Sequence, residues 1–148
     1  GERRVEIHAS ADSPTRLEQL RGRDVVVVDD MVRTGSTIVE CCRRLKAAEA
    51  RRVIFMVTHF HSSEEVKENL SDPSIDEIVT TNCLPAILNR DMQGRLRRKM
   101  LVLKIEKWIA DTLRCQVFGQ CAPRYDPPYT VDVSSKNPLW WPMRELRG

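Results

Sequence analysis

Two adjacent carboxylates and a short loop of hydroxyl-bearing and glycine residues are the groups in this 148-residue chain best suited to chemistry. Asp29 and Asp30 follow the apolar run Val25–Val28, and the segment Arg33–Thr37 reads Arg-Thr-Gly-Ser-Thr. Carboxylates accept hydrogen bonds from sugar hydroxyls, whereas backbone N–H groups at a helix start attract an anion. The combination favours a sugar phosphate as the ligand.

The apolar runs indicate the strands that must position these groups. Val25–Val28 consists of four β-branched residues and predicts a strand buried on both faces of a parallel sheet. Val53–Thr58 predicts a second interior strand, and Ile75–Thr80 and Met100–Ile105 predict two more. Open α/β sheets bind ligands at the carboxyl ends of their strands, which is where Asp29 and Asp30 stand.

Three helices are expected between or after these strands. The first begins at Ser36 or Thr37, where Thr37 and Glu40 have the spacing of a capping box. The second starts near Ser62, and the third spans Glu106–Arg114. Their apolar positions are Ile38, Cys42 and Leu45; Val66 and Leu70; and Ile105, Ile109 and Leu113. This alternation predicts an α/β fold of three layers with a mostly parallel central sheet.

The segment Val25–Thr37 resembles the phosphoribosyl-pyrophosphate motif of type I phosphoribosyltransferase folds. The order of the later segments is similar to the C-terminal domain of ribose-phosphate pyrophosphokinases. These segments are Val53–His59, which ends in Thr-His; Ile75–Asn82, which is followed by Leu84-Pro85; and Leu101–Leu113. The resemblance covers about residues 20–115. Three features depart from the family pattern: Arg33, Ser36, and the His-Phe-His sequence of residues 59–61.

The resemblance implies a domain that binds ribose 5-phosphate or phosphoribosyl pyrophosphate. Such a domain would be part of a synthetase that transfers pyrophosphate from ATP to ribose 5-phosphate, with Mg²⁺ as the cofactor if it is active. Asp29 and Asp30 are expected to bind the ribose. The phosphate is expected on Arg33, Thr34, Gly35, Ser36 and Thr37. No metal ligand and no catalytic residue is assigned.

The family's N-terminal domain and basic flap, which help to form the ATP site, are not visible in this sequence. We therefore expect the ATP site on a missing domain or a partner, in a homo- or hetero-oligomer, and an isolated chain that is inactive. One alternative is a non-catalytic, synthetase-associated regulatory or scaffolding subunit of a larger assembly. Another is a nucleobase phosphoribosyltransferase. Arg33 has two interpretations: it holds a phosphate, or it compensates the charge of Asp29 and Asp30.

Other polar groups carry weaker signals. His59 and His61 form an H-x-H pair, but a metal site needs at least a third ligand. The basic run Arg90–Lys99 fits a solvated surface better than an RNA site, so RNA is not favoured. The five cysteines have no zinc-site spacing, which predicts free thiols in a reducing compartment. That compartment is expected to be the cytoplasm, with the mitochondrion as the alternative.

Composition is that of an ordinary globular domain, with 41% hydrophobic residues, 30% charged residues and a formal net charge of +3. No apolar stretch has the length of a membrane span, and no signal peptide is visible. Val5–His8 could form a short edge strand. We divide the chain into a phosphoribosyltransferase-like domain, 1–116, and a C-terminal arm containing proline and tryptophan, 117–148. Trp140 and Trp141 in this arm are candidates for a partner contact.

Overall fold

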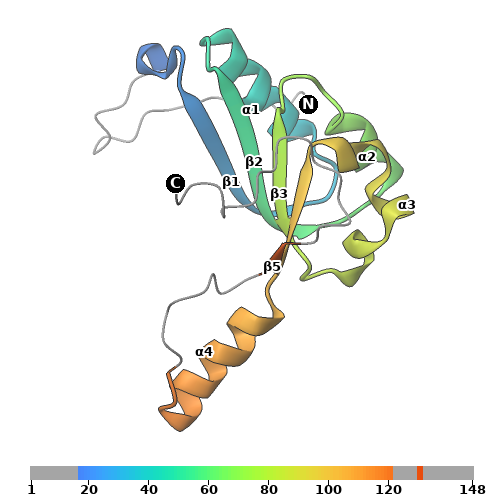
Figure 1. The fold of residues 1–148 in the computed structure, drawn as a ribbon. Coiled ribbons are helices and arrows are strands. Elements are labelled where there is room, and N and C mark those ends of the chain that lie inside the picture. The colour runs from blue at the N-terminus through green and yellow to red at the C-terminus, as the bar shows by residue number, and fades with distance from the viewer. Residues whose placement is uncertain (1–16, 122–129, 132–148) are drawn as a thin grey trace, which may run out of the picture.

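The computed structural model describes residues 17–121 and 130–131, and these form one sheet with the strand order β1-β2-β3-β4-β5 (Figure 1). The strands are β1 (Asp24–Val32), β2 (Arg52–Phe60), β3 (Glu77–Thr81), β4 (Met100–Lys104) and β5 (Thr130–Val131). Strands β1 to β4 are parallel, and β5 pairs with β4 in the antiparallel sense. The predicted α/β fold with a mostly parallel sheet is confirmed.

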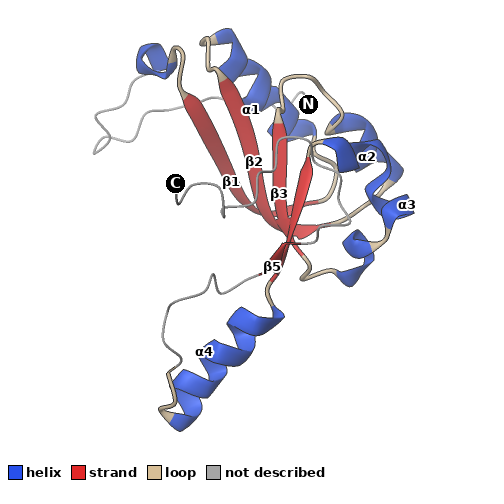
Figure 2. Cartoon of the chain, in the orientation of Figure 1, coloured by secondary structure: helices blue, strands red, loops and turns tan. Residues whose placement is uncertain are grey.

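The helices include the three that were predicted, in the predicted order, and one short helix, α3, that was not predicted (Figure 2). They are α1 (Ser36–Ala47), α2 (Glu64–Asn69), α3 (Arg90–Gln93) and α4 (Glu106–Phe118), with 3-10 turns at η1 (Leu17–Leu20), η2 (Pro85–Leu88) and η3 (Gly94–Arg98). The capping box at Thr37 is wrong, because α1 is capped by Gly35 and no side chain bonds there. The cap of α2 is Ser63, whose Oγ accepts from the backbone N of Val66 at 3.2 Å.

The hydrophobic core lies between one face of the sheet and helices α1 and α2. Val53, Phe55 and Val57 of β2 are at most 1% exposed, and they alternate with outward-facing neighbours as a strand's pleat requires. The predicted apolar stripes of the first two helices are buried in the same cluster: Ile38, Cys42, Leu45, Val66 and Leu70. β2 is therefore an interior strand, as its sequence predicts.

β1 corrects one prediction, because it forms the edge of the sheet among the described residues. Val26 is 50% exposed and Val28 is 70% exposed, while Val25 and Val27 face the core. Val28 lies beside Met56 of β2, which is also exposed. Four valines in succession predict a strand, but they do not predict whether both of its faces are covered. The described helices that contribute to the core lie on one face of the sheet, so a covering third layer is not observed there.

α4 leaves the sheet directly after Ile105 and extends away from it (Figure 1). None of its residues is buried, although the helix is one turn longer than predicted and carries an apolar stripe. Its exposed large apolar residues are Trp108, Ile109, Leu113, Val117 and Phe118. No helix of the described residues is long and apolar enough to cross a membrane.

The cysteines do not all remain free. Cys115 near the end of α4 forms a disulfide with Cys121, so the prediction of free thiols is wrong for this pair. The helix ends at Gly119 in a left-handed conformation, which turns the chain back and brings the two sulfur atoms together. Cys41, Cys42 and Cys83 are free thiols. The predicted strand at residues 5–8 and the two tryptophans at 140 and 141 lie outside the described residues.

Candidate functional site

The loop between β1 and α1 is shaped by a glycine that no other residue could replace without strain. Gly35 has φ 84°, in the left-handed region that disfavours a side chain. A Cβ atom at this position would lie 3.0 Å from Cδ2 of Leu70, so the space is also closed. The carbonyl of Gly35 accepts the first helical hydrogen bond, from the N of Val39 at 3.0 Å. The first N–H groups of α1 consequently have no partner within the helix and are available to a ligand.

A hollow of about 260 Å³ opens beside this loop, at the carboxyl end of β1. Its lining contains five of the seven predicted site residues: Asp29, Arg33, Thr34, Gly35 and Thr37. Met31, Val32 and Ile38 supply the remaining wall. Ser36 does not line the hollow, but its hydroxyl lies 3.4 Å from that of Thr34. A carboxylate, a cation and backbone amides at a helix start thus surround one concavity.

Asp29 and Asp30 do not act as a pair in this geometry. β1 continues to Val32, so the two side chains project from opposite faces of the strand. Asp29 lines the hollow, and its Oδ1 accepts from the backbone N of Asp30 at 2.8 Å. Asp30 is exposed and does not line it. A tight turn after Asp30 would have joined the carboxylates, but the turn begins only after Val32.

Arg33 is exposed at the mouth of the hollow. No ion pair joins it to Asp29 or Asp30 in the part of the chain that the structure describes. Of the two interpretations of this residue, charge compensation within the loop is therefore not observed. An exposed guanidinium is a charge-assisted donor that can bind an anion.

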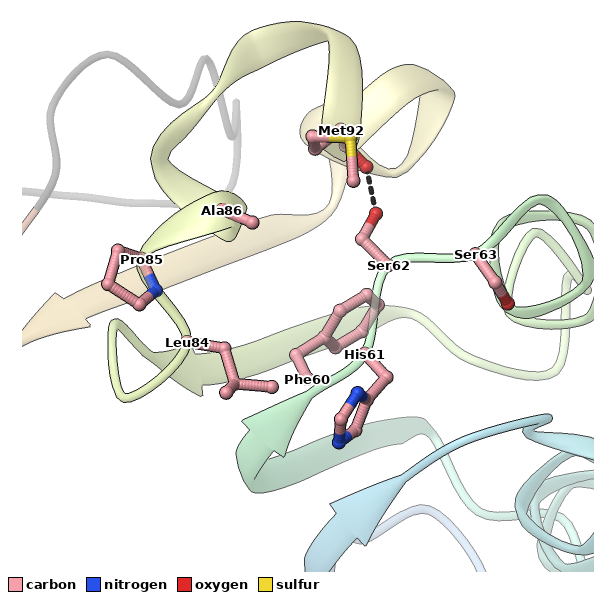
Figure 3. Close-up of a pocket in the computed structure, with 8 residues that line it drawn as sticks. All are labelled: Phe60, His61, Ser62, Ser63, Leu84, Pro85, Ala86 and Met92. Atoms are coloured by element: carbon pink, nitrogen blue, oxygen red, sulfur yellow. Dashed lines mark hydrogen bonds between the residues drawn. The ribbon is translucent and has the colours of Figure 1, made fainter.

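A second cavity, of about 410 Å³, was not predicted from the sequence (Figure 3). It lies at the carboxyl ends of β2 and β3, and Ser62 Oγ donates to the backbone oxygen of Met92 across it. The backbone N of His61 donates to the oxygen of Val32 at 3.2 Å, which ties its wall to the end of β1. Its lining is mostly apolar: Phe60, His61, Ser62, Ser63, Leu84, Pro85, Ala86 and Met92. The only sequence signal was that two strand-end turns, at residues 60–63 and 84–86, must share one sheet edge.

The two histidines of the H-x-H pair separate. Nδ1 of His59 lies 3.1 Å from the backbone oxygen of Asp30, whereas His61 lines the second cavity. Across residues 17–121 and 130–131, no group of three or more His, Cys, Asp or Glu side chains could hold a metal ion. Any Mg²⁺ here would need oxygen ligands from a substrate as well as from the protein.

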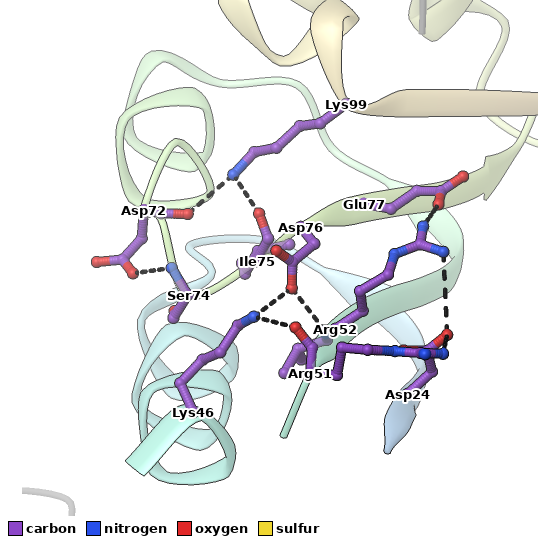
Figure 4. Close-up of polar contacts among 11 residues, drawn as sticks. Asp24, Lys46, Arg51, Arg52, Asp72, Ser74, Ile75, Asp76, Glu77 and Lys99 are labelled. Carbon is purple, nitrogen blue, oxygen red and sulfur yellow. Dashed lines mark hydrogen bonds and ion pairs between the residues drawn. The ribbon is translucent and has the colours of Figure 1, made fainter. Parts of the chain in front are cut away.

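The amino ends of the strands, opposite the two hollows, carry a network of charged residues that contact one another (Figure 4). Lys46 Nζ pairs with Asp76 Oδ2 at 2.7 Å, and Arg52 pairs with Glu77 at 2.5 Å. Lys99 donates to the backbone oxygens of Asp72 and Ile75, both at 2.9 Å, and burial lowers its pKa. These three cations have protein partners, whereas no ion pair of Arg33 is found among the described residues.

Comparison with known proteins identifies the family. The description "Phosphoribosyl transferase domain" matches residues 2–86, which is more than half of the chain. The chain belongs to the phosphoribosyl transferase domain family. The hollow beside residues 33–37 lies within the matched region, so the loop predicted from the sequence is part of the family's domain.

Individual relatives show which members of this family the chain is similar to. Ribose-phosphate pyrophosphokinase of Haemophilus ducreyi is 36% identical over 92 residues, which cover 62% of this chain and 28% of that protein. The same enzyme of Haemophilus influenzae is 34% identical with the same coverage. Phosphoribosylpyrophosphate synthetase of Mycobacterium smegmatis superimposes with a TM-score of 0.57 at 28% identity, covering 68% of this chain and 32% of that structure. The predicted resemblance is confirmed, and the chain spans about a third or less of these relatives.

Proposed function

We propose that this chain binds the phosphoribosyl group of ribose 5-phosphate or phosphoribosyl pyrophosphate at the loop of residues 33–37. The observation that carries the proposal is the hollow that joins Asp29, Arg33 and the start of α1 in one concavity. A dianionic phosphate would accept hydrogen bonds from the backbone N–H groups at this helix start, where the helix dipole favours negative charge. The hydroxyls of Thr34 and Thr37, which line the hollow, would donate further bonds. Ser36 would act through its hydroxyl, which lies 3.4 Å from that of Thr34.

Within this proposal the ribose is held mainly by Asp29. Its carboxylate lines the hollow and can accept hydrogen bonds from the ribose hydroxyls. Asp30 faces away from the hollow, so it would act through the backbone that Asp29 and His59 contact rather than on the sugar. Arg33 would close the mouth over the phosphate as a charge-assisted donor.

The chain would serve as one part of a ribose-phosphate pyrophosphokinase that transfers pyrophosphate from ATP to ribose 5-phosphate. Mg²⁺ would be held by Asp29 together with substrate oxygens, and it would neutralise charge on the transferring phosphoryl oxygens. Transfer also needs cations that stabilise the developing charge. Among the described residues, Arg33 is the basic side chain that lines the hollow. We therefore propose that the ATP site lies on another domain or a partner subunit and that the isolated chain is inactive.

The unit that performs this role is proposed to be residues 1–116, with 117–148 as an arm for a partner contact, in a homo- or hetero-oligomer in the cytoplasm. If the chain is instead a scaffolding subunit, we expect no ligand to bind in the hollow, because a purely structural subunit needs none there. The relatives named above are pyrophosphokinases, so a nucleobase phosphoribosyltransferase is not favoured.

Titration calorimetry with ribose 5-phosphate tests the proposal. Asp29→Asn should lower the affinity about tenfold, because an amide accepts sugar hydroxyls with less charge, which corresponds to ~1.4 kcal/mol. Asp30→Asn is the matched control and should change the affinity less than about twofold. Equal losses in both variants would contradict the assignment of the ribose to Asp29. A wild-type chain that binds neither sugar phosphate would favour the scaffolding alternative.

A further inference from the structure

The C-terminal end of α2 contacts the loop of residues 33–37, although it lies about 35 residues further along the chain. Nδ2 of Asn69 donates to the backbone oxygen of Thr34 at 2.8 Å. The next residue, Leu70, is fully buried and packs against the backbone of Gly35. The loop therefore has a polar contact and an apolar contact from the same helical turn.

The contact from Asn69 fixes the direction of a peptide group. In a trans peptide the carbonyl and the following N–H point in opposite directions. An amide donor that holds the Thr34 oxygen towards α2 must therefore turn the N–H of Gly35 away from α2. Thr34 and Gly35 line the hollow, whereas Asn69 and Leu70 do not. The side of the peptide that faces away from α2 is therefore the side on which an anion in the hollow would lie.

The turn that carries Asn69 is itself held in place. Val66 is fully buried one turn before it, and the N of Leu70 donates to the oxygen of Val66 at 2.9 Å. Nη2 of Arg43 on α1 pairs with Oδ2 of Asp72 at 2.6 Å, two residues after Leu70. The end of α2 is thereby connected to α1, the helix whose start is the proposed anion site, so its position relative to the loop is fixed.

We propose that Asn69 is a positioning residue for the anion site, because it pins the Thr34–Gly35 peptide with the N–H of Gly35 facing the hollow. The inference rests on the proposed function. Without this donor the peptide can rotate, and the Thr34 oxygen then presents a partial negative charge to the phosphate. Preorganised donors bind an anion without the cost of reorienting the backbone.

Three variants test the role by calorimetry with inorganic phosphate and with ribose 5-phosphate. Asn69→Asp keeps the size but replaces the donor by an anion, and should lower both affinities more than tenfold. Asn69→Ala should lower them about five- to tenfold, and Asn69→Gln, which keeps an amide donor, should retain more affinity than Asn69→Ala. Asn89→Ala is the control, because Asn89 is another amide with a 2.8 Å hydrogen bond, which its Oδ1 accepts from the N of Asp91 at the cap of α3.

A direct measurement separates this inference from the proposed function. NMR of the ligand-free chain should detect a scalar coupling across the hydrogen bond between Nδ2 of Asn69 and the carbonyl carbon of Thr34, and Asn69→Ala should shift the amide of Gly35 with little change in the core. If wild type binds neither ligand while this coupling is present, the proposed function fails and the pinned peptide stands. If the coupling is absent, or if Asn69→Asp binds like wild type with a native circular dichroism spectrum, the inference is overturned.

Discussion

Helices α1 and α4 have nearly the same length and each follows a parallel strand, yet they make opposite contributions to the fold. α1 buries Ile38, Val39, Cys42 and Leu45, whereas α4 buries no residue. α1 is separated from β1 by residues 33–35, which reverse the chain, but Ile105 alone separates α4 from β4. Connections in α/β units commonly use two to six residues. The comparison teaches that an apolar stripe predicts a helix, while the connection before it decides whether the stripe is buried.

The connection before α4 also fixes its direction. The N of Ile105 donates to Oδ1 of Asn82 at 3.1 Å, and Nδ2 of Asn82 donates to Glu106 at 2.6 Å. These two bonds join the first residues of the helix to the end of β3. A helix held so close to its strand cannot reverse over the sheet, so its apolar residues remain on the surface.

Matched leucine truncations should show the largest difference between the two helices. Leu45→Ala should lower the free energy of unfolding by ~2–5 kcal/mol, because it removes a buried side chain and leaves a cavity. Leu113→Ala should change it by less than ~0.5 kcal/mol, because Leu113 is 56% exposed. Urea unfolding followed by circular dichroism measures both values.

The circular dichroism signal at 222 nm provides the control for this pair, since alanine favours a helix and neither variant should lose helical content when folded. A loss above ~2 kcal/mol for Leu113→Ala would contradict the comparison. It would mean that α4 is covered in solution and contributes to the cooperative core.

The sequence predicts where helices and strands lie better than it predicts which of their residues are buried. Helix and strand positions follow from local periodicity, so the bounds of β2 and the starts of α1 and α2 were predicted to within two residues. The edge position of β1 could not be predicted, because Val25–Val28 has the same apolar pattern whether a neighbour covers it or not. The burial of Leu45 and the exposure of Leu113 also look alike in sequence, since each depends on contacts with distant residues.

The candidate site also has features that the sequence predicts and features that depend on the fold. Gly35 and the helix start were predictable from turn chemistry, because a left-handed position before a helix favours glycine. The separation of Asp29 from Asp30 was not, since it depends on how far β1 continues. Leu70 was predicted as an apolar position of the second helix, but the contacts of Asn69 and Leu70 with the loop had no sequence signal. These contacts exist only because α1 and α2 pack on one face of the sheet.

The link between α1 and the end of α2 should give an intermediate effect that depends on pH. Although burial opposes its ionisation, hydrogen bonds from Ser74 and the Arg43 guanidinium lower the pKa of Asp72 to about 2. A carboxyl with a lowered pKa stabilises the fold above its unfolded pKa, near 4, and the contribution is lost as the pH falls towards 2. Asp72→Asn should therefore cost ~1–2 kcal/mol at pH 6 and progressively less below pH 4.

Urea unfolding of wild type and Asp72→Asn at several pH values between 6 and 2.5 provides the measurement. Asp24→Asn is the comparison variant, because Asp24 pairs with Arg51, which also lowers its pKa, but on the exposed edge of β1. It should cost less than Asp72→Asn at pH 6. A difference between wild type and Asp72→Asn that stays constant from pH 6 to pH 2.5 would show that the carboxylate charge is not what joins the two helices.

The smallest global effect should come from the disulfide at the end of α4. Breaking Cys115–Cys121 frees a short loop, and the chain-entropy model assigns ~2 kcal/mol to a closure of this size. The disulfide stabilises only the part of the chain whose unfolding frees this loop. Because α4 buries none of its residues in the described structure, Cys115→Ser should loosen the last turn of the helix and leave the core transition unchanged.

Two measurements on Cys115→Ser separate local from global stability. Hydrogen exchange should accelerate at the amides of residues 115–119, while the thermal midpoint should shift by less than about 1 °C, because the energy is not coupled to global unfolding. Reduction of wild type should reproduce both results, since Cys42 is already a buried thiol whose pKa burial raises to about 12, and it gains no new reactivity. A fall of several degrees would place α4 inside the cooperative unit, and the contrast with α1 would then reflect surface exposure alone.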